Sequence, residues 1–305
     1  METLIIGGNG LVGTALIKKL CERGEKIISF SSRPPEYRAE GCTYYQGDIT
    51  EYGTINMIFK NHRVARVIHN AAISHPKLFT DNPYKIFRVN VTGTLTALEA
   101  ARNFGVQRFV YMSSCAVYGD VKADVVDETF PLYSNTAYGA SKIACENIVR
   151  TYGLDTVALR CGFIYGPLRK FECPVNQILT DLIKTGNVNW SQGIDQHLDF
   201  IYVDDCVDAV IAVAYADTIK HAEYNVGGGE MIPFRRIVDQ AQKIYPYANI
   251  HVGSGDLGYD SMGMLSIQRL YNDYGWKPTI TIEEGMKKYN SWLRKNMQPS
   301  NSIQE

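Results

Sequence analysis

The chain has 305 residues, and its 31 Lys and Arg residues nearly balance 32 Asp and Glu residues, which gives a formal net charge of −1. This balance excludes the basic surface of a nucleic-acid binder or of a polybasic membrane-surface protein, so we expect no nucleic-acid partner and no membrane partner. Hydrophobic residues make up 45% of the chain, as in a packed globular core. No apolar run reaches 18 residues, so no transmembrane helix is expected.

The cysteines and the N-terminus indicate the compartment. An odd number of cysteines without a Cys-x-x-Cys pair predicts reduced thiols rather than a disulfide framework or a zinc site, so no metal is expected. The N-terminus carries Glu2 and leads directly into an apolar run, which is not typical of a signal peptide. These features predict a cytoplasmic protein.

Short apolar runs alternate with helical patterns along the first half of the chain. Residues 11–22, 89–102 and 137–152 have the apolar spacing of amphipathic helices. The apolar runs have the character of buried strands and cover residues 4–6, 26–30, 64–69, 108–112 and 156–160. This alternation predicts an α/β fold with a doubly wound parallel Rossmann sheet.

Beyond residue 165 the pattern loosens, although a short strand and an apolar helix return over 199–215. We therefore expect a dinucleotide-binding Rossmann domain made of residues 1–165 and 199–224. Residues 166–198 and 225–305 are expected to form a smaller C-terminal α/β substrate lobe. The polar tail after Met297 is expected to be mobile.

A glycine-rich turn joins the first strand to the first helix. It contains Gly7, Gly10, Leu11, Val12 and Gly13. Glycine lets a pyrophosphate approach the backbone closely, and the free N–H groups at the start of the helix favour its charge. A plain glycine turn is the alternative, but the flanking strands and the helix favour dinucleotide binding.

The end of the second strand bears on the choice of cofactor. NAD sites place an acid there for the ribose hydroxyls, whereas NADP sites use small polar residues and an arginine for the 2′-phosphate. Here the strand is followed by Ser32 and Arg33 without an acid, which favours NADP over NAD. An Arg33 side chain that points into solvent would remove this preference.

Polar stretches at 69–72, 113–119 and 138–142 follow the predicted strands and would meet at the carboxyl edge of the sheet, where ligands bind. Tyr138 and Lys142 are four residues apart and share one face of a helix. An ammonium group and a positively charged nicotinamide would favour the phenolate of a tyrosine, whose ordinary pKa is ~10. Tyr138 is therefore a candidate general acid/base.

With these stretches, the chain resembles the extended short-chain dehydrogenase/reductase family, which contains NAD-dependent epimerases and dehydratases such as the nucleotide-sugar epimerases. The resemblance covers nearly the whole length. It rests on the glycines of the turn, Gly47-Asp48-Ile49, residues 69–72, Val89-Asn90-Val91-Thr92-Gly93-Thr94, residues 113–119, Tyr138 with Lys142, residues 159–167 and 199–205, and Gly275-Trp276-Lys277-Pro278.

The resemblance implies roles for individual residues. Ser114 would bind the reacting oxygen, Tyr138 would be the acid/base, and Lys142 would hold the nicotinamide ribose and lower the pKa of Tyr138. The residues implied to hold the adenine, to line the cofactor site and to support the active site are, in that order, Asp48 with Ile49, Ala71 with Ala72, and Asn90. Asp48 and Asn90 could instead be cap or turn residues.

Departures from the family pattern narrow the function. Dehydratases of the family carry Thr-Asp-Glu where this chain has Ser114-Cys115-Ala116, so dehydration is not expected. Three diphosphate ligands of nucleotide-sugar members align with apolar or glycine positions, which leaves a diphosphate without donors. These positions are Phe163, Leu198 and Gly253. The alternative is a local slip of the alignment, with a donor supplied by Arg169, His197, Arg235 or Arg236; His197 by itself is not placed in the site.

We therefore expect an NAD(P)-dependent oxidoreductase that moves a hydride to or from a hydroxyl or ketone carbon of a sugar-like or small polar substrate. Hydrogen bonds are expected near Ser114, Tyr138 and the segment around Gln192. The second hypothesis is a nucleotide-sugar C4 epimerase acting by transient oxidation, and the third is a non-catalytic cofactor-sensing protein. Uridine, thymidine and guanosine diphosphates are expected to bind no more tightly than about 1 mM.

A homodimer is also expected, because in this family two long helices of each subunit form a four-helix bundle. The corresponding segments here are about 83–103 and 137–152. Small residues that suit close approach, either to a second copy or to the sheet, are Ala97, Ala100, Ala101, Ala140 and Ala144.

Overall fold

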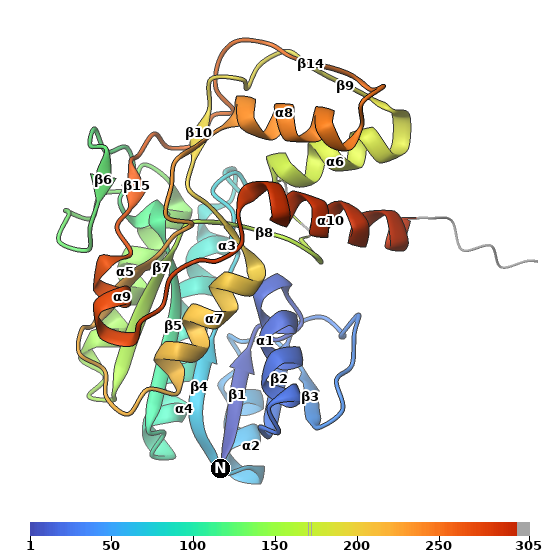
Figure 1. Ribbon diagram of the computed structural model, residues 1–305. Coiled ribbons are helices and arrows are strands. Elements are labelled where there is room, and N and C mark those ends of the chain that lie inside the picture. Colours follow the sequence, from blue (N-terminus) through green and yellow to red (C-terminus); the bar gives the residue numbers. More distant parts are fainter. Residues whose placement is uncertain (170, 172, 298–305) are drawn as a thin grey trace, which may run out of the picture.

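The computed structural model describes residues 1–169, 171 and 173–297, so the tail expected after Met297 lies outside the described residues. A seven-stranded parallel sheet of order β12-β7-β5-β4-β1-β2-β3 forms the centre (Figure 1). Its strands are β1 (Glu2–Ile6), β2 (Ile27–Ser31), β3 (Cys42–Gln46), β4 (Val64–His69), β5 (Arg108–Ser114), β7 (Thr156–Cys161) and β12 (Glu223–Val226). The expected doubly wound α/β fold is confirmed. The two edge strands, β3 and β12, were not predicted.

Helices cover both faces of this sheet and bury an apolar core on each (Figure 1). One face carries α1 (Leu11–Glu22) and α7 (Val203–Ala214). The other carries α2 (Tyr52–Asn61), α4 (Gly93–Asn103) and α5 (Ala137–Thr151). The chain enters α4 through α3 (Pro83–Phe87) and a π-helical segment, Arg88–Thr92. The helix expected over 89–102 therefore begins with a wider turn than an α-helix has.

The alanines considered for a dimer contact divide into two groups. Ala97, Ala100 and Ala101 are fully buried in the core beneath α4, so they pack within the subunit and are not available to a second copy. Ala140 and Ala144 on α5 are half-buried.

The second half of the chain builds a smaller layer beyond the carboxyl ends of the strands (Figure 1). Its helices there are α6 (Pro174–Thr185), α8 (Phe234–Ile244) and α10 (Ile282–Met297), whereas α9 (Gln268–Tyr274) packs beside β12. Two-residue to four-residue ladders connect its loops. They pair β8 (Phe163–Tyr165) with β11 (Phe200–Tyr202), β9 (Asn187–Trp190) with β14 (Asn249–Val252), β10 (His197–Leu198) with β13 (Ile232–Pro233), and β6 (Val125–Val126) with β15 (Met264–Leu265).

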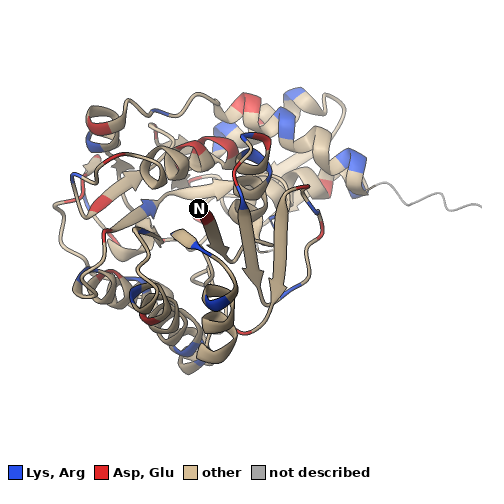
Figure 2. Cartoon of the chain, turned by 90° about the horizontal axis from the view of Figure 1, so that it is seen from below, with Lys and Arg blue, Asp and Glu red and all other residues tan. Residues whose placement is uncertain are grey.

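The described surface carries charges of both signs. Lys and Arg are interspersed with Asp and Glu over the face in Figure 2. In the described part of the chain, no helix combines the length and the apolar character needed to cross a membrane. All seven cysteines are free thiols.

A buried ion pair fixes α5 against the sheet. Arg160 on β7 donates to the Glu146 carboxylate on α5, with the closest N–O distance 2.8 Å, and both residues are about 2% exposed. Glu146 also accepts the Ser113 hydroxyl at 2.5 Å, and Arg160 donates to Tyr118 Oη at 3.0 Å. This network connects β5 and β7 to α5, the helix that also carries Tyr138.

Replacing Arg160 should destabilise the protein strongly. Arg160→Met leaves the Glu146 carboxylate buried without its cation, which costs about 3–5 kcal/mol. Urea denaturation measures this loss. The matched control is Arg102→Met, which breaks the exposed Arg102–Glu99 pair and should leave the midpoint almost unchanged. Equal losses in the two variants would contradict a stabilising role for the buried network.

Candidate active site

A cavity of about 630 Å³ lies at the carboxyl edge of the sheet. From β1 the chain first adds β2 and β3 on one side of the sheet and then adds β4, β5, β7 and β12 on the other. The strand order therefore reverses at β1, and ligands bind at such a switch point. Most of the residues expected from the sequence line this cavity: Gly7, Gly10, Leu11, Val12, Ser32, Arg33, Asp48, Ile49, Ala71, Ala72, Ser114, Tyr138 and Lys142. Gly13 and Asn90 do not line it.

The turn after β1 needs glycine at two positions for steric reasons. Gly7 has a φ of +82°, and a Cβ there would lie 2.6 Å from the backbone nitrogen of Ala71. A Cβ at Gly13 would lie 2.3 Å from the carbonyl oxygen of Gly7. At Gly10 the only close atom is that same oxygen, at 3.4 Å, so the protein itself leaves room there. The open side of Gly10 belongs to the cavity, and α1 starts beside it without an acidic residue in its first turn. This arrangement fits a phosphate group at the helix N-terminus.

A buried asparagine ties the end of β2 to the glycine turn. Asn9 donates to the carbonyl oxygen of Arg33 at 2.6 Å and accepts the Ser29 hydroxyl at 2.9 Å. The Gln46 side chain donates to the carbonyl oxygen of Ser32 at 3.2 Å. The backbone that carries Arg33 is therefore held at the rim of the cavity. Sequence reasoning did not identify Asn9, although its place inside the glycine turn could have drawn attention to it.

Asp48 makes the local turn hydrogen bonds that the sequence analysis left open as an alternative, whereas Asn90 bonds residues of distant segments. Asp48 accepts from the backbone nitrogen and the hydroxyl of Thr50, each at 2.9 Å, while also facing the cavity. Asn90 is 1% exposed, accepts from the backbone nitrogen of Ile73 at 2.8 Å and donates to the Ser141 hydroxyl at 2.9 Å. It therefore links α5 to the loop that follows Ala72.

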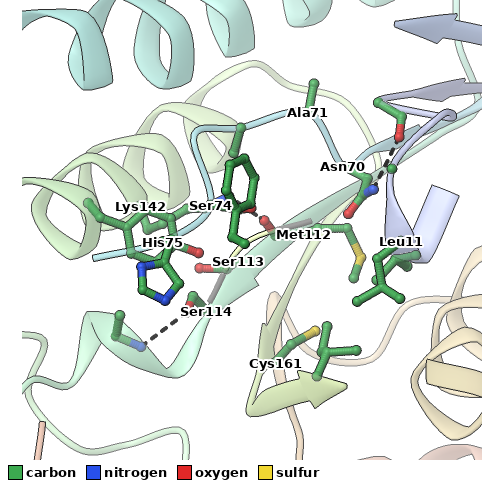
Figure 3. A pocket seen from close by; sticks show the side chains of 18 of the residues that line it. Leu11, Asn70, Ala71, Ser74, His75, Met112, Ser113, Ser114, Lys142 and Cys161 are labelled. Carbon is green, nitrogen blue, oxygen red and sulfur yellow. Dashed lines mark hydrogen bonds between the residues drawn. The ribbon is translucent and has the colours of Figure 1, made fainter. Parts of the chain in front are cut away.

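Ser114 and Tyr138 meet inside the cavity. Ser114 ends β5, and its hydroxyl accepts from the backbone nitrogen of Ala116 at 3.3 Å (Figure 3). Tyr138 lies in the first turn of α5 and is 6% exposed. Burial raises the pKa of the Tyr138 phenol to about 12, while a hydrogen bond with Ser114 and the positive charge of Arg169 act to lower it. The phenol is therefore protonated at neutral pH in the protein alone.

Lys142 points into the protein rather than into solvent. Its Nζ donates to the carbonyl oxygen of Met112 at 2.6 Å and lies 5.9 Å from the centroid of the Tyr138 ring. Burial lowers the pKa of Lys142 to about 8, and the neighbouring Cys145 is the largest influence in the other direction. In Figure 3, Lys142, His75 and Ser114 lie at one side of the cavity and Leu11 and Asn70 at the other.

Two of the three positions aligned with diphosphate ligands line the cavity, and the third does not. Phe163 and Leu198 line the cavity, so its wall is apolar there, as expected. Gly253 instead donates to the carbonyl oxygen of Trp190 at 2.9 Å, and a Cβ there would lie 2.1 Å from the carbonyl oxygen of Ser191. It is held beside the β9–β14 ladder and does not face the cavity.

Of the four residues considered as alternative donors, one lines the cavity and three do not. Arg169 lines the cavity. Arg235 is exposed on α8, and Arg236 is paired with Glu230 and Glu283. His197 is exposed, and its ring bonds the carbonyl oxygen of Asp195.

The segment around Gln192, where substrate hydrogen bonds are expected, does not line the main cavity. Gln192 lines a second hollow of about 460 Å³, together with Lys77 and Trp190. Tyr259 lines both hollows, so they adjoin each other.

Sequence reasoning missed several residues of the cavity wall, among them His75, Tyr259, Asp260 and Met262. His75 is 2% exposed, and its Nδ1 accepts from the backbone nitrogen of Lys77 at 3.2 Å. Its place three residues after Ala72 was the one available signal. The segment 259–262 comes from more than 100 residues beyond Tyr138, and no local pattern marks it.

The sequence and the structure both match known proteins. The model of the NAD dependent epimerase/dehydratase family matches residues 3–227. The chain belongs to this family, within the extended short-chain dehydrogenases/reductases. It is therefore an enzyme, which excludes the non-catalytic hypothesis.

Individual relatives share the whole length. The chain is 27% identical to a UDP-glucose 4-epimerase of Lacticaseibacillus casei over 91% of this chain and 92% of that protein. It is 26% identical to a UDP-glucuronate 4-epimerase of Thermodesulfobacterium geofontis, with 98% of each chain covered. The structure of the Thermus thermophilus UDP-glucose 4-epimerase with NAD superposes with a TM-score of 0.87 at 26% identity, covering 97% of this chain and 100% of that chain.

The buried Lys142 should make stability depend on pH. Its pKa is about 8 in the folded protein against the usual 10.5, so between these values the unfolded chain binds more protons. The free energy of unfolding should therefore rise by about 2 kcal/mol between about pH 8 and about pH 10, relative to Lys142→Met, which cannot titrate. Urea denaturation of both proteins across this range measures the difference. Parallel pH profiles would contradict the lowered pKa.

Proposed function

We propose that the protein transfers a hydride between NAD(P) and a hydroxyl or ketone carbon of a sugar-like substrate, with Ser114, Tyr138 and Lys142 as its catalytic residues. The observation that carries this proposal is that Ser114 and the buried Tyr138 line the same cavity, at the switch point of the sheet, as the buried Lys142. A bound nicotinamide supplies the hydride acceptor or donor. The glycine turn and the start of α1 would hold the pyrophosphate, and Lys142 would face the nicotinamide ribose.

Side chains of the protein would then transfer the proton of the substrate hydroxyl. For oxidation the Tyr138 phenol first releases its own proton to solvent, and the resulting phenolate would then accept the substrate hydroxyl proton on Oη while Ser114 holds the substrate oxygen. When a ketone is reduced, the protonated phenol returns that proton to the oxygen. Burial favours the protonated phenol, so the positive charges of Arg169 and the cofactor assist the oxidation direction.

The residues after Ser114 argue against dehydration. Removal of water needs an acid and a base next to the sugar, and this chain has Cys115 and Ala116 there. Burial raises the pKa of the Cys115 thiol to about 12, so it neither donates nor accepts a proton readily at neutral pH.

A second candidate is a nucleotide-sugar 4-epimerase, which the adjoining second hollow favours because it offers space beyond a single sugar. We test the two together by incubating the protein with NAD or NADP and a panel of sugars, sugar acids and nucleotide sugars. Accumulation of reduced cofactor supports net oxidation. A sugar inverted at one carbon without net reduction supports the epimerase, as would micromolar binding of uridine, thymidine or guanosine diphosphate by calorimetry. If neither reduced cofactor nor an inverted sugar forms with any member of the panel, the result counts against both candidate functions.

Tyr138→Phe should abolish turnover and leave cofactor affinity nearly intact, because it removes the proton-transfer group and little else. Steady-state rates and cofactor titrations measure the two effects. Tyr133→Phe, at an exposed position, is the matched control and should behave as the wild type. A Tyr138→Phe variant that keeps more than about a tenth of the wild-type rate would reject the role.

We further propose that the protein prefers NADP, with Arg33 contacting the 2′-phosphate. Arg33→Ala should then weaken NADP binding more than NAD binding in fluorescence titrations, because only NADP carries the charge that the guanidinium pairs with. Arg38→Ala is the control, since Arg38 stacks on Tyr44 away from the cavity. Equal effects on both cofactors, or tighter binding of NAD by the wild type, would overturn this preference.

We also propose a homodimer that uses α3 and α5. Tyr84 and Phe87 on α3 are 75% and 38% exposed, which is unusual for large apolar side chains side by side on one helix. Light scattering should give a dimeric mass for the wild type and for Tyr247→Glu, and a monomeric mass for Tyr84→Glu. A monomeric wild type would contradict the proposal.

The proposed chemistry divides the chain as the sequence analysis expects. Residues 1–165 with 199–224 would bind the cofactor, and residues 166–198 with 225–305 would bind the substrate.

A further inference from the structure

Arg169 occupies an unusual place in the main cavity. It follows β8 in the segment that leads to α6, and its guanidinium carbon lies 5.6 Å from the centroid of the Phe163 ring. Its Nε is buried and has no hydrogen-bond partner among the described residues. Leaving a buried donor of a cation unsatisfied costs free energy, so a ligand that supplies an acceptor there would gain it back.

The other cationic side chains of the cavity wall lie elsewhere or already have a hydrogen-bond partner. The described cationic residues on the wall are Arg33, Lys142 and Arg169. Arg33 lies beyond the glycine turn at the end of β2, and Lys142 donates to the carbonyl oxygen of Met112. Among these three, Arg169 is therefore the cation on the part of the cavity wall that also carries Phe163 and Leu198. These two side chains are apolar, and a low local dielectric strengthens a charge pair.

Arg169 and Tyr138 line the same cavity of about 630 Å³. A ligand that fills this cavity can therefore contact both side chains, and the positive charge of Arg169 also acts to lower the pKa of the Tyr138 phenol. Asp260 lies on the same wall, and burial raises the pKa of its carboxyl group.

We propose that Arg169 binds an anionic group, a carboxylate or a phosphate, carried by the sugar whose hydroxyl carbon faces Tyr138. The inference rests on the proposed hydride transfer and adds the substrate class: acidic or phosphorylated sugars rather than neutral ones. The planar guanidinium can bond two oxygens of such a group, including through the buried Nε. A neutral sugar has no charged acceptor for it.

Calorimetry on the cofactor-saturated protein tests this with matched pairs: glucuronate against glucose, glucose 6-phosphate against glucose, and UDP-glucuronate against UDP-glucose. In at least one pair the anionic member should bind about tenfold more tightly or better, which corresponds to about 1.4 kcal/mol. The first and third pairs identify a carboxylate, and the second identifies a phosphate. Equal affinities within every pair, or no binding of any member, would overturn the proposal.

Two variants assign the preference to Arg169. Arg169→Gln should remove it while changing the affinity of the neutral member by less than about threefold, and Arg169→Lys should restore part of it because the charge returns without the planar fork. Arg235→Gln removes the same charge from an exposed position on α8 and should keep the preference. Unchanged cofactor affinity shows that each variant is folded. A preference that survives Arg169→Gln would overturn the assignment.

The same variants separate this inference from the proposed function. If anionic and neutral members bind equally while Tyr138→Phe still abolishes turnover, the anion site falls and hydride transfer stands. If Tyr138→Phe leaves turnover intact, the proposed function falls whatever the binding preference is.

Discussion

The close contact between Gly7 and the backbone of Ala71 is the constraint on which the site depends. The loops after β1 and β4 cross the same edge of the sheet, and a side chain at position 7 would collide with the Ala71 backbone. Because these loops touch, α1 starts at the floor of the cavity and presents its N-terminus there. Ser114 then follows from β5, the next strand along the sheet, and α5 crosses above it.

The position of α5 is fixed by buried polar contacts rather than by apolar packing alone. Asn90 bonds Ser141 on one side of the helix, and Arg160 pairs with Glu146 one turn further on. Lys142 lies between them and donates to the backbone carbonyl oxygen of Met112. The helix thus carries two charged groups into the interior. Glu146 is neutralised by Arg160, whereas burial of Lys142 disfavours its charged form and lowers its pKa.

Local patterns made part of this predictable. Gly7, Gly13, Tyr138 and Lys142 stand at short, fixed spacings, and the apolar runs of the central strands are continuous, so the fold and the part of the cavity around the glycine turn and Tyr138 could be predicted from the sequence. Edge strand β3 was missed because its residues are only partly buried and lack a continuous apolar run. The partner of Lys142 was also out of reach, because a backbone carbonyl has no sequence signature.

The part of the cavity formed by the second half of the chain was less predictable because it depends on contacts between distant segments. Gly253 was aligned with a diphosphate ligand of the family, whereas it is held beside the β9–β14 ladder and does not line the cavity. Asp260 reaches the wall because β15 pairs with β6, a ladder of two residues on each side. Such a short ladder leaves no periodic pattern that a reader of the sequence could find.

The late position of the segment 259–262 has a consequence for synthesis on the ribosome. The last strand of the sheet, β12, ends at Val226, so all seven strands exist before Tyr259 is made. A nascent chain of that length contains the glycine turn, Ser114 and Tyr138, while one wall of the cavity is still missing. Vectorial folding from the N-terminus would therefore form the part of the cavity around the glycine turn first and complete its last wall only near the end of translation.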